Sequence, residues 1–314
     1  MTEDELAAKV CQFYYFEQMT MSEIGDRVGL SRHKVGRILS GAIASGLVKI
    51  EIRHPLSRSS SLENELVSRF NLRSALVPNF SEALPAEELK QRVGAAAARF
   101  VSSTLSDGDI VGVGWGTTTF EVANQINGTS AKQIKVVQIT GGNGALGARF
   151  SCQDVTRTFA TKLGVEPILL HAPAIVGNSS TRDLLLQEPM IRDVADLFSK
   201  ISISVVGIGT LEPMASALAE SGLIPAKNLK EIIRQGAIGD IYSYFIDSDG
   251  NVVDTDLNDR MIAIGLDDIK RIPRSVAVAT GTSKAGAVRA AAVAGLANVL
   301  VVDEALAEAI LRRD

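Results

Sequence analysis

The chain has 314 residues, 46% of them hydrophobic and 22% charged, with a formal net charge of −4 at pH 7. This composition can bury two domain cores, and it excludes wholesale disorder. No apolar run approaches the roughly 18 residues that span a bilayer, the N-terminus lacks a signal-peptide layout, and Cys11 and Cys152 are too isolated for a disulfide framework or a cysteine-based metal site. We therefore expect a cytoplasmic protein without a metal or another cofactor.

The charge is unevenly distributed along the chain. Residues 20–58 contain seven basic and three acidic side chains, so this segment carries +4 and the rest of the chain −8. Charge alone does not distinguish a solvated basic face from a surface that binds nucleic acid. The helix signals of this segment favour the second interpretation.

Three short helices are predicted near the N-terminus. The first covers residues 3–18, and a capping box at Thr20 and Glu23 opens the second, "MSEIGDRV". A turn with glycine follows, and Ser31 is a suitable N-cap for a third helix that begins at Arg32.

Two short helices joined by a tight turn, the second one basic at its start, are typical of a helix-turn-helix. The start of the second helix would reach base edges, while neighbouring Lys and Arg side chains would contact phosphates. The alternating segment "GLVKIEIRHP" (46–55) predicts a strand, as in a winged helix. A three-helix bundle without a ligand is the alternative. The candidate DNA-binding residues are Thr20, Ser31, Arg32, His33, Lys34 and Arg37.

A Ser-rich break, "HPLSRSSSLENEL", marks the expected domain boundary. It leads into the predicted helix "LENELVSRF". We therefore expect a helix-turn-helix domain over 1–54, a linker and linker helix over 55–70, and an effector domain over 71–314.

From about residue 70 onward, short Val- and Ile-rich runs end in Gly or Thr and alternate with helical stretches. Continuous apolar strands indicate burial on both faces, so the fold class is α/β with a mainly parallel sheet. Ligands of such sheets collect beyond the carboxyl ends of the strands.

The segment "VGVGWGTTTF" (111–120) places such a turn between a strand and a helix. It matches neither the dinucleotide fingerprint nor a Walker A motif. Free backbone N–H groups at a helix start, together with three threonine hydroxyls, suit an anion and above all a phosphate. A tight packing turn is the alternative. The candidates are Gly114, Gly116, Thr117, Thr118 and Thr119.

Other polar residues lie at predicted strand ends. Lys284, in "TGTSKAGAVRA", could bind phosphate or sugar hydroxyls, form a Schiff base, or be a solvated residue of a first helical turn. Asp247 and Asp249 flank a turn and are plausible partners of sugar hydroxyls, although Asp-Gly turns are commonly only turns. Glu121 and Asp154 are weaker candidates.

These segments, together with "ITGG", "GDIYSYFIDSDG", "NDRMIAIGLDDI" and "GTSKAGAVRAAAVAGLANVLVVDEALA", give the chain a resemblance to the SorC family of bacterial sugar-responsive transcription regulators over nearly its whole length. The resemblance implies an effector domain similar to phosphosugar isomerases and glucosamine-phosphate deaminases, tetramers on operator DNA, and a sugar phosphate or related sugar or polyol as effector. It also implies that the effector site includes Thr140, Gly141, Gly142, Asp247 and Lys284.

Two functions of different class follow. The first is a regulator of a carbohydrate operon that is controlled by a ligand and has no catalytic residues. In it, the turn of segment 111–120 binds the effector, and the basic third helix binds DNA in response. The second is a sugar-phosphate isomerase with an accessory DNA domain, which would need a positioned base such as Asp154 or Asp247. The sequence shows no recognisable acid–base pair, so we favour the regulator.

Overall fold

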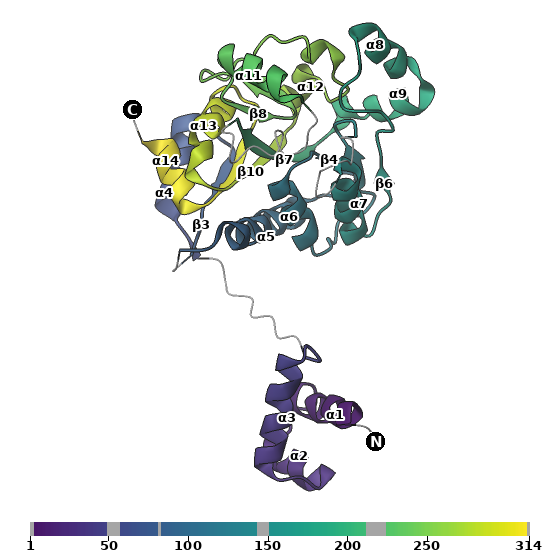
Figure 1. The fold of residues 1–314 in the computed structure, drawn as a ribbon, viewed down its shortest axis with the longest axis vertical. Coiled ribbons are helices and arrows are strands. Elements are labelled where there is room, and N and C mark those ends of the chain that lie inside the picture. The colour runs from purple at the N-terminus through teal and green to yellow at the C-terminus, as the bar shows by residue number, and fades with distance from the viewer. Residues whose placement is uncertain (1–2, 49–56, 81–82, 143–150, 212–223, 313–314) are drawn as a thin grey trace. The chain divides into compact units, whose positions relative to one another are not determined.

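The computed structural model describes residues 3–48, 57–80, 83–142, 151–211 and 224–312. The chain divides into two compact units, residues 1–55 and 56–314 (Figure 1). None of the helices in the described ranges is long and apolar enough to cross a membrane.

The N-terminal unit is a three-helix domain. Its helices are α1 (Glu3–Tyr15), α2 (Met21–Val28) and α3 (Arg32–Ala44). Val10, Ile24 and Val35, one from each helix, are fully buried at its centre. Gly25 is required where α2 meets the following turn, because a Cβ there would lie 2.4 Å from the carbonyl oxygen of Leu30. The expected wing falls largely on residues 49–56, which lie outside the described residues.

The second unit is built on a mainly parallel sheet, as the apolar runs predict. Its order among the described strands is β2-β11-β10-β7-β4-β5-β6, and the antiparallel hairpin β8–β9 extends from β7. The strands are β2 (Ser74–Leu76), β4 (Ile110–Val113), β5 (Lys135–Gln138), β6 (Pro167–Ile168), β7 (Ile203–Thr210), β8 (Gly239–Ile241), β9 (Tyr244–Ile246), β10 (Arg274–Ala279) and β11 (Val299–Val302). A separate two-stranded pair joins β1 (Ser57–Arg58) to β3 (Pro78–Asn79).

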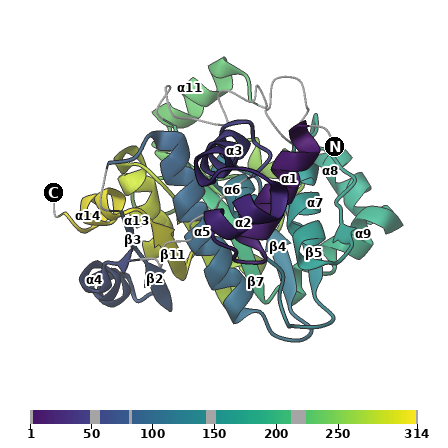
Figure 2. The same ribbon diagram turned by 90° about the horizontal axis from the view of Figure 1, so that it is seen from below.

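Helices cover both faces of this sheet, since alternate strand residues belong to different cores. In β10, Val276 and Val278 pack with α5, α6 and α7, whereas Ala277 and Ala279 pack with α4, α13 and α14. Figures 1 and 2 show α5, α6 and α7 together on one face. The helices are α4 (Ser60–Phe70), α5 (Ala86–Thr104), α6 (Thr117–Gln125), α7 (Cys152–Leu163), α8 (Ser179–Gln187), α9 (Pro189–Ala195), α11 (Ala226–Arg234), α12 (Leu266–Arg271), α13 (Ala285–Val293) and α14 (Glu304–Leu311), with short 3-10 turns η1 (Phe198–Lys200), η2 (Asn258–Arg260) and η3 (Thr282–Lys284).

The helix expected as a linker is instead part of the second unit. Leu66 of α4 is fully buried, and α4 packs against β2 and α14. The buried carboxylate of Glu63 accepts hydrogen bonds from the backbone N–H of Val77 (2.8 Å) and from Arg58 (2.7 Å), which holds the first turn of α4 to the adjoining strands. The sequence signal was a polar, Ser-rich approach to this helix, and it did not reveal that the helix itself is packed.

Candidate functional site

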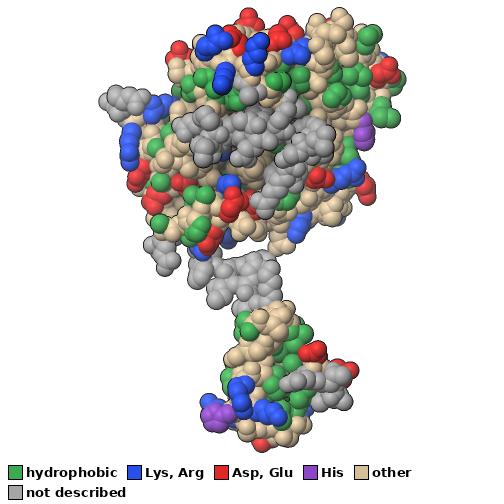
Figure 3. Space-filling view, viewed as in Figure 1, with side chains coloured by type: hydrophobic (Ala, Val, Ile, Leu, Met, Phe, Trp, Pro, Cys, Tyr) green, Lys and Arg blue, Asp and Glu red, His purple; other side chains and the backbone are tan. Residues whose placement is uncertain are grey.

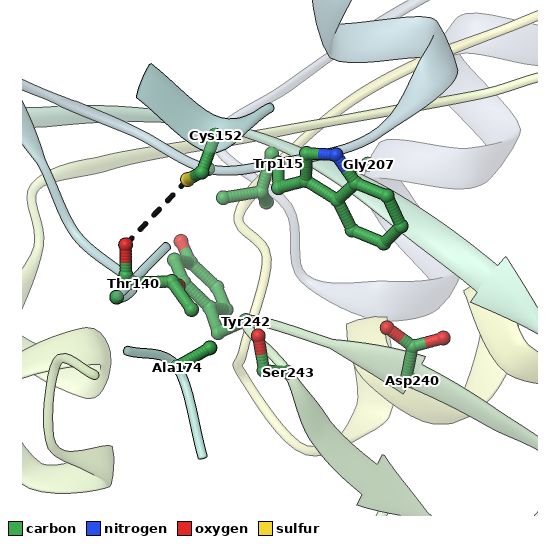
Figure 4. A pocket seen from close by; sticks show the side chains of 11 residues that line it. Trp115, Thr140, Cys152, Ala174, Gly207, Asp240, Tyr242 and Ser243 are labelled. Atoms are coloured by element: carbon green, nitrogen blue, oxygen red, sulfur yellow. Dashed lines mark hydrogen bonds between the residues drawn. The ribbon is translucent and has the colours of Figure 1, made fainter. Parts of the chain in front are cut away.

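A pocket lies where the sheet reverses its strand order. The chain proceeds from β4 to β5 on one side, and later returns to place β7 on the other side of β4, which makes the crevice between β4 and β7 a switch point. The lining residues are Gly114, Trp115, Thr140, Gly141, Cys152, Ala174, Val206, Gly207, Asp240, Tyr242 and Ser243 (Figure 4).

The N-terminus of α6 forms one side of the site. Gly116 is its N-cap, with a φ of 150° that favours glycine, and no side chain caps the helix. The first intrahelical bond runs from the N–H of Phe120 to the carbonyl oxygen of Gly116 (2.9 Å), so the N–H groups of Thr117, Thr118 and Thr119 have no intrahelical acceptor. These N–H groups and the positive end of the helix dipole favour an anion.

A buried hydroxyl beside this turn strengthens that assignment. Thr119 is fully buried, and its Oγ1 has no hydrogen-bond partner among the described residues. A Cβ added to Gly116 or to Gly207 would lie 3.5 Å from this oxygen, so the hydroxyl faces two backbone segments that carry no side chains. A buried polar group without a partner costs free energy, and a bound anion would satisfy this one.

Asp240 supplies a carboxylate on the opposite side. It lies on β8 beside Gly209 of β7, and a Cβ at Gly209 would be only 1.9 Å from its Oδ1, so the glycine makes room for it. Within the described part of the chain the carboxylate accepts no hydrogen bond. Burial raises the pKa of Asp240 to about 6, although the nearby ammonium of Lys284 opposes the increase.

Lys284 ends the η3 turn directly before α13, and its ammonium interacts electrostatically with this carboxylate. Burial lowers the pKa of its ammonium, and the positive charge of Lys90 lowers it further. The carboxylates of Asp240 and Asp303 oppose this decrease. Gly281 opens the turn with a φ of 90°, and its N–H donates to Asp303 (2.8 Å), which also caps α14. No ion pair joins Lys284 to Asp240 among the described residues, and Asp240 lines the pocket.

Most of the predicted effector residues lie at or next to this pocket. Gly114, Thr140 and Gly141 line it, and the first turn of α6 adjoins it. Gly142 follows, where its backbone pairs with Ala172 and Ala174. The family resemblance also implies that the segment "GARFSCQDVTRTFA" (147–160) lines the sugar end of the site, and its residues 147–150 lie outside the described residues.

The carboxylate of Asp247, which the family resemblance places in the effector site, lies in a turn that it helps to hold. It accepts hydrogen bonds from the N–H groups of Asp249 (2.9 Å) and Asn251 (2.8 Å) and so stabilises its own turn. That turn packs through Gly250 against Ala290 and Ala294. Ala290 lies in the second half of α13, and Ala294 is its C-cap. Asp247 is not among the described residues that line this pocket, and its contact with a sugar stays a prediction.

The other carboxylates have structural roles as well. Asp154 closes a capping box with Ser151 at the start of α7, and these hydrogen bonds hold the pKa of its carboxyl below its usual value. Glu121 packs on Gly94, where an added Cβ would approach its own to 2.9 Å.

Sequence reasoning missed Asp240, Trp115 and the turn Tyr242–Ser243. Asp240 stands in the quoted segment "GDIYSYFIDSDG", and the glycine before it marks a close backbone approach: a Cβ at Gly239 would meet Ala287 at 2.4 Å. The turn signal of residues 247–250 favoured Asp247 as the sugar contact instead. Cys152 also lines the pocket, but burial raises the pKa of its thiol to about 12, which excludes a thiolate nucleophile at neutral pH.

The basic helix of the N-terminal unit has the character that its sequence predicts. The side chains of Arg32, His33, Lys34 and Arg37 are exposed, and the described structure gives them no ion pair. Figure 3 shows Lys, Arg and His side chains gathered at one end of this unit. Thr20 and Ser31 are N-caps: their side-chain oxygens accept the N–H groups of Glu23 and Lys34, both at 3.3 Å.

Known proteins resemble the chain over its full length. Residues 54–312 match the family described as "Putative sugar-binding domain". The transcriptional regulator LsrR of Klebsiella pneumoniae is 31% identical over 99% of this chain and 94% of its own length. The full-length sorbitol operon regulator SorC of Klebsiella pneumoniae has a similar structure, with a TM-score of 0.73 and 27% identity over 99% of both chains. The chain belongs to the SorC family of transcription regulators.

A further relative in this family is the deoxyribonucleoside regulator of Bacillus subtilis, which is 27% identical over 98% of this chain and 97% of its own length. The sorbitol operon regulator and the deoxyribonucleoside regulator are named for different small molecules. Family membership therefore assigns a regulator with a sugar-binding domain, and the pocket must account for the effector.

Proposed function

We propose that the pocket binds a phosphorylated sugar or polyol, and that this effector controls how the helix-turn-helix binds operator DNA of a carbohydrate operon. The main support for this proposal is that the N-terminus of α6, which has no side-chain cap, and the carboxylate of Asp240, which accepts no hydrogen bond among the described residues, lie at the same pocket. The first turn of α6 and the hydroxyl of Thr119 suit the phosphate, whereas Asp240 suits sugar hydroxyls. Lys284, which interacts electrostatically with Asp240, could bind either part.

Operator binding rests on α3 in this proposal. Its exposed cations are Arg32, Lys34 and Arg37, and its N-cap Ser31 fixes where the helix begins. A helix of this kind enters the major groove with its N-terminal residues. One helix-turn-helix buries little DNA surface, and paired half-sites multiply affinity, so the protein should bind as a homo-oligomer, for which we propose a tetramer.

The effector acts by binding and not by turnover. The two carboxylates that sequence reasoning considered as an isomerase base, Asp154 and Asp247, are held in a capping box and in a turn. The names of the relatives support a regulator as well. Incubation with pentose and hexose phosphates, followed by product analysis, should show no conversion, and any isomerised product would favour the enzyme.

Thermal unfolding in the presence of a compound panel tests the effector class. The panel contains ribose 5-phosphate, glucose 6-phosphate and sorbitol 6-phosphate, each beside its unphosphorylated counterpart. A ligand of the folded state raises the melting temperature with the logarithm of its saturation. Stabilisation by a phosphorylated compound and not by its counterpart supports the proposal, whereas equal stabilisation by both refutes a phosphate site.

The second half of the test couples this binding to DNA. A duplex that the full-length protein selects from a random pool serves as the operator, and light scattering gives the oligomeric state. The stabilising compound should change the affinity for that duplex. An unchanged affinity would separate the pocket from the DNA site, and a monomer with and without DNA would contradict the oligomer.

A further inference from the structure

The hairpin that carries Asp240 has an unusual turn. Two residues, Tyr242 and Ser243, connect β8 to β9, because Ile241 pairs directly with Tyr244. Their φ angles are 55° and 72°, so both occupy the left-handed region. Two-residue hairpins with this geometry normally use Asn-Gly or Asp-Gly, since a side chain of ordinary size is disfavoured there. A tyrosine in the first position therefore needs compensation from its surroundings.

The hydroxyl of Tyr242 supplies that compensation. Its ring is buried, and its hydroxyl lies 2.6 Å from the Oγ of Ser204 and 2.6 Å from the Oγ of Ser275. These serines are register partners on the central strands β7 and β10. The turn is thus attached to the middle of the sheet, which is its most rigid part.

The direction of these hydrogen bonds follows from one further contact. Ser275 donates its proton to the carbonyl oxygen of Leu296 at 2.8 Å, so its oxygen accepts the proton of Tyr242. The oxygen of Tyr242 then accepts the proton of Ser204. The hydroxyls of Ser204, Tyr242 and Ser275 thus form one continuous series of hydrogen bonds. Burial raises the pKa of Tyr242 to about 12, so its phenol remains neutral. Satisfied buried networks of this kind rigidify what they hold.

The hairpin held in place carries two of the polar side chains that line the pocket, Asp240 and Ser243. Figure 4 shows the side chains of Asp240 and Ser243 on the side of the pocket that faces Trp115. Asp240 has no hydrogen bond of its own in the described structure, so only the backbone of β8 and the room at Gly209 fix its direction. A shift of the turn would move this carboxylate directly.

We infer that Tyr242 is a positioning residue for the effector: its hydroxyl holds the strained turn so that Asp240 meets the sugar hydroxyls in a fixed geometry. This inference rests on the proposed function and extends it to selectivity. The phosphate end, on the first turn of α6, belongs to a different element. Tyr242 therefore acts on the recognition of the sugar and leaves recognition of the phosphate unchanged.

A double-mutant cycle tests this role, with the most stabilising sugar phosphate of the panel as the probe. Tyr242→Phe removes only the hydroxyl, and we expect about 3- to 10-fold weaker binding, as for the loss of a neutral hydrogen bond. In the Asp240→Asn background the same change should have little further effect. In the Thr119→Val background it should be additive, because Thr119 belongs to the phosphate end.

Tyr244→Phe is the matched control. Tyr244 lies two residues away on β9, and its hydroxyl donates to the carbonyl oxygen of Ile264 (3.1 Å) outside the pocket lining. This variant loses one hydrogen bond from the same hairpin and should bind the probe as the wild type does. If the hydroxyl of Tyr242 served stability alone, Tyr242→Phe and Tyr244→Phe should weaken binding of the probe to the same extent. Alternatively, Tyr242→Phe should weaken binding by the same factor in the Asp240→Asn and Thr119→Val backgrounds.

The outcomes separate the inference from the function beneath it. A wild-type protein that no panel compound stabilises would overturn both. A wild type that binds the probe, with a Tyr242→Phe effect that is absent or fully additive with Asp240→Asn, would overturn the positioning role alone. Circular dichroism checks that each variant folds. If Tyr242→Phe does not, Ser204→Ala removes the donor to the same hydroxyl and should weaken binding with the same coupling to Asp240.

Discussion

Replacing Asp240 by Asn should stabilise the protein while weakening its response to the effector. The side chain is half-buried at the pocket, and desolvation raises the pKa of its carboxyl from 3.8 to about 6. Each pH unit of such a change corresponds to about 1.4 kcal/mol, so ionised Asp240 costs the folded state about 3 kcal/mol. Asparagine has nearly the same shape and removes the charge.

The net gain is smaller than that figure, for two reasons. Asp240 attracts Lys284, and the variant loses this attraction. The new amide is itself a polar group that lacks a partner. We expect a gain of about 1–2 kcal/mol, which for an effector domain of this size is a rise of roughly 3–6 °C in melting temperature.

The pH dependence of this gain identifies its cause. The pKa of Asp240 is higher in the folded than in the unfolded state, so the penalty is absent below pH 3.8, develops as the pH rises through about 6, and is complete above that value. Melting temperatures of both proteins from pH 4 to 8 should therefore diverge with rising pH. A variant that is equally or less stable than the wild type at pH 8 would refute the reasoning. Affinity for the stabilising sugar phosphate should fall at the same time.

Three further changes probe the remaining parts. Thr119→Val removes a buried hydroxyl without a partner, so it should raise the melting temperature of the free protein and weaken binding of the sugar phosphate about ten- to a hundredfold; unchanged titration would remove Thr119 from the phosphate site. Lys284→Met keeps the apolar stem and deletes a charge that burial disfavours, so effector binding should weaken while operator binding persists; a normal effector titration would show that Lys284 is only a helix-start residue. Arg32→Ala with Arg37→Ala should weaken operator binding and flatten its dependence on salt, since each phosphate contact releases counterions; wild-type affinity in gel-shift titrations at several salt concentrations would misplace the recognition helix.

The strand and helix pattern of the second unit was readable because it depends on local signals. Continuous apolar runs identify strands buried on both faces, and "GWGTTT" identifies a helix start at a strand end. The position of Asp240 in the pocket could not be predicted from local sequence signals. Its place in the site depends on β8 pairing with the far end of β7 and on a glycine thirty-one residues earlier in the chain, at position 209. Asp247 has the more conspicuous local signal, an Asp-Gly turn, and its carboxylate accepts hydrogen bonds within that turn.

The packing of α4 also defines where a regulator of this kind can be divided. Leu66 and Glu63 are buried in the second unit, so a cut after α4 would expose apolar surface and separate the carboxylate of Glu63 from the backbone N–H of Val77. A cut between residues 48 and 57 removes neither core. Exchanging DNA-binding units at that junction should yield chimeric biosensors that keep the sugar pocket and report on a different promoter, and the same junction would let evolution recombine one sensor with many operators.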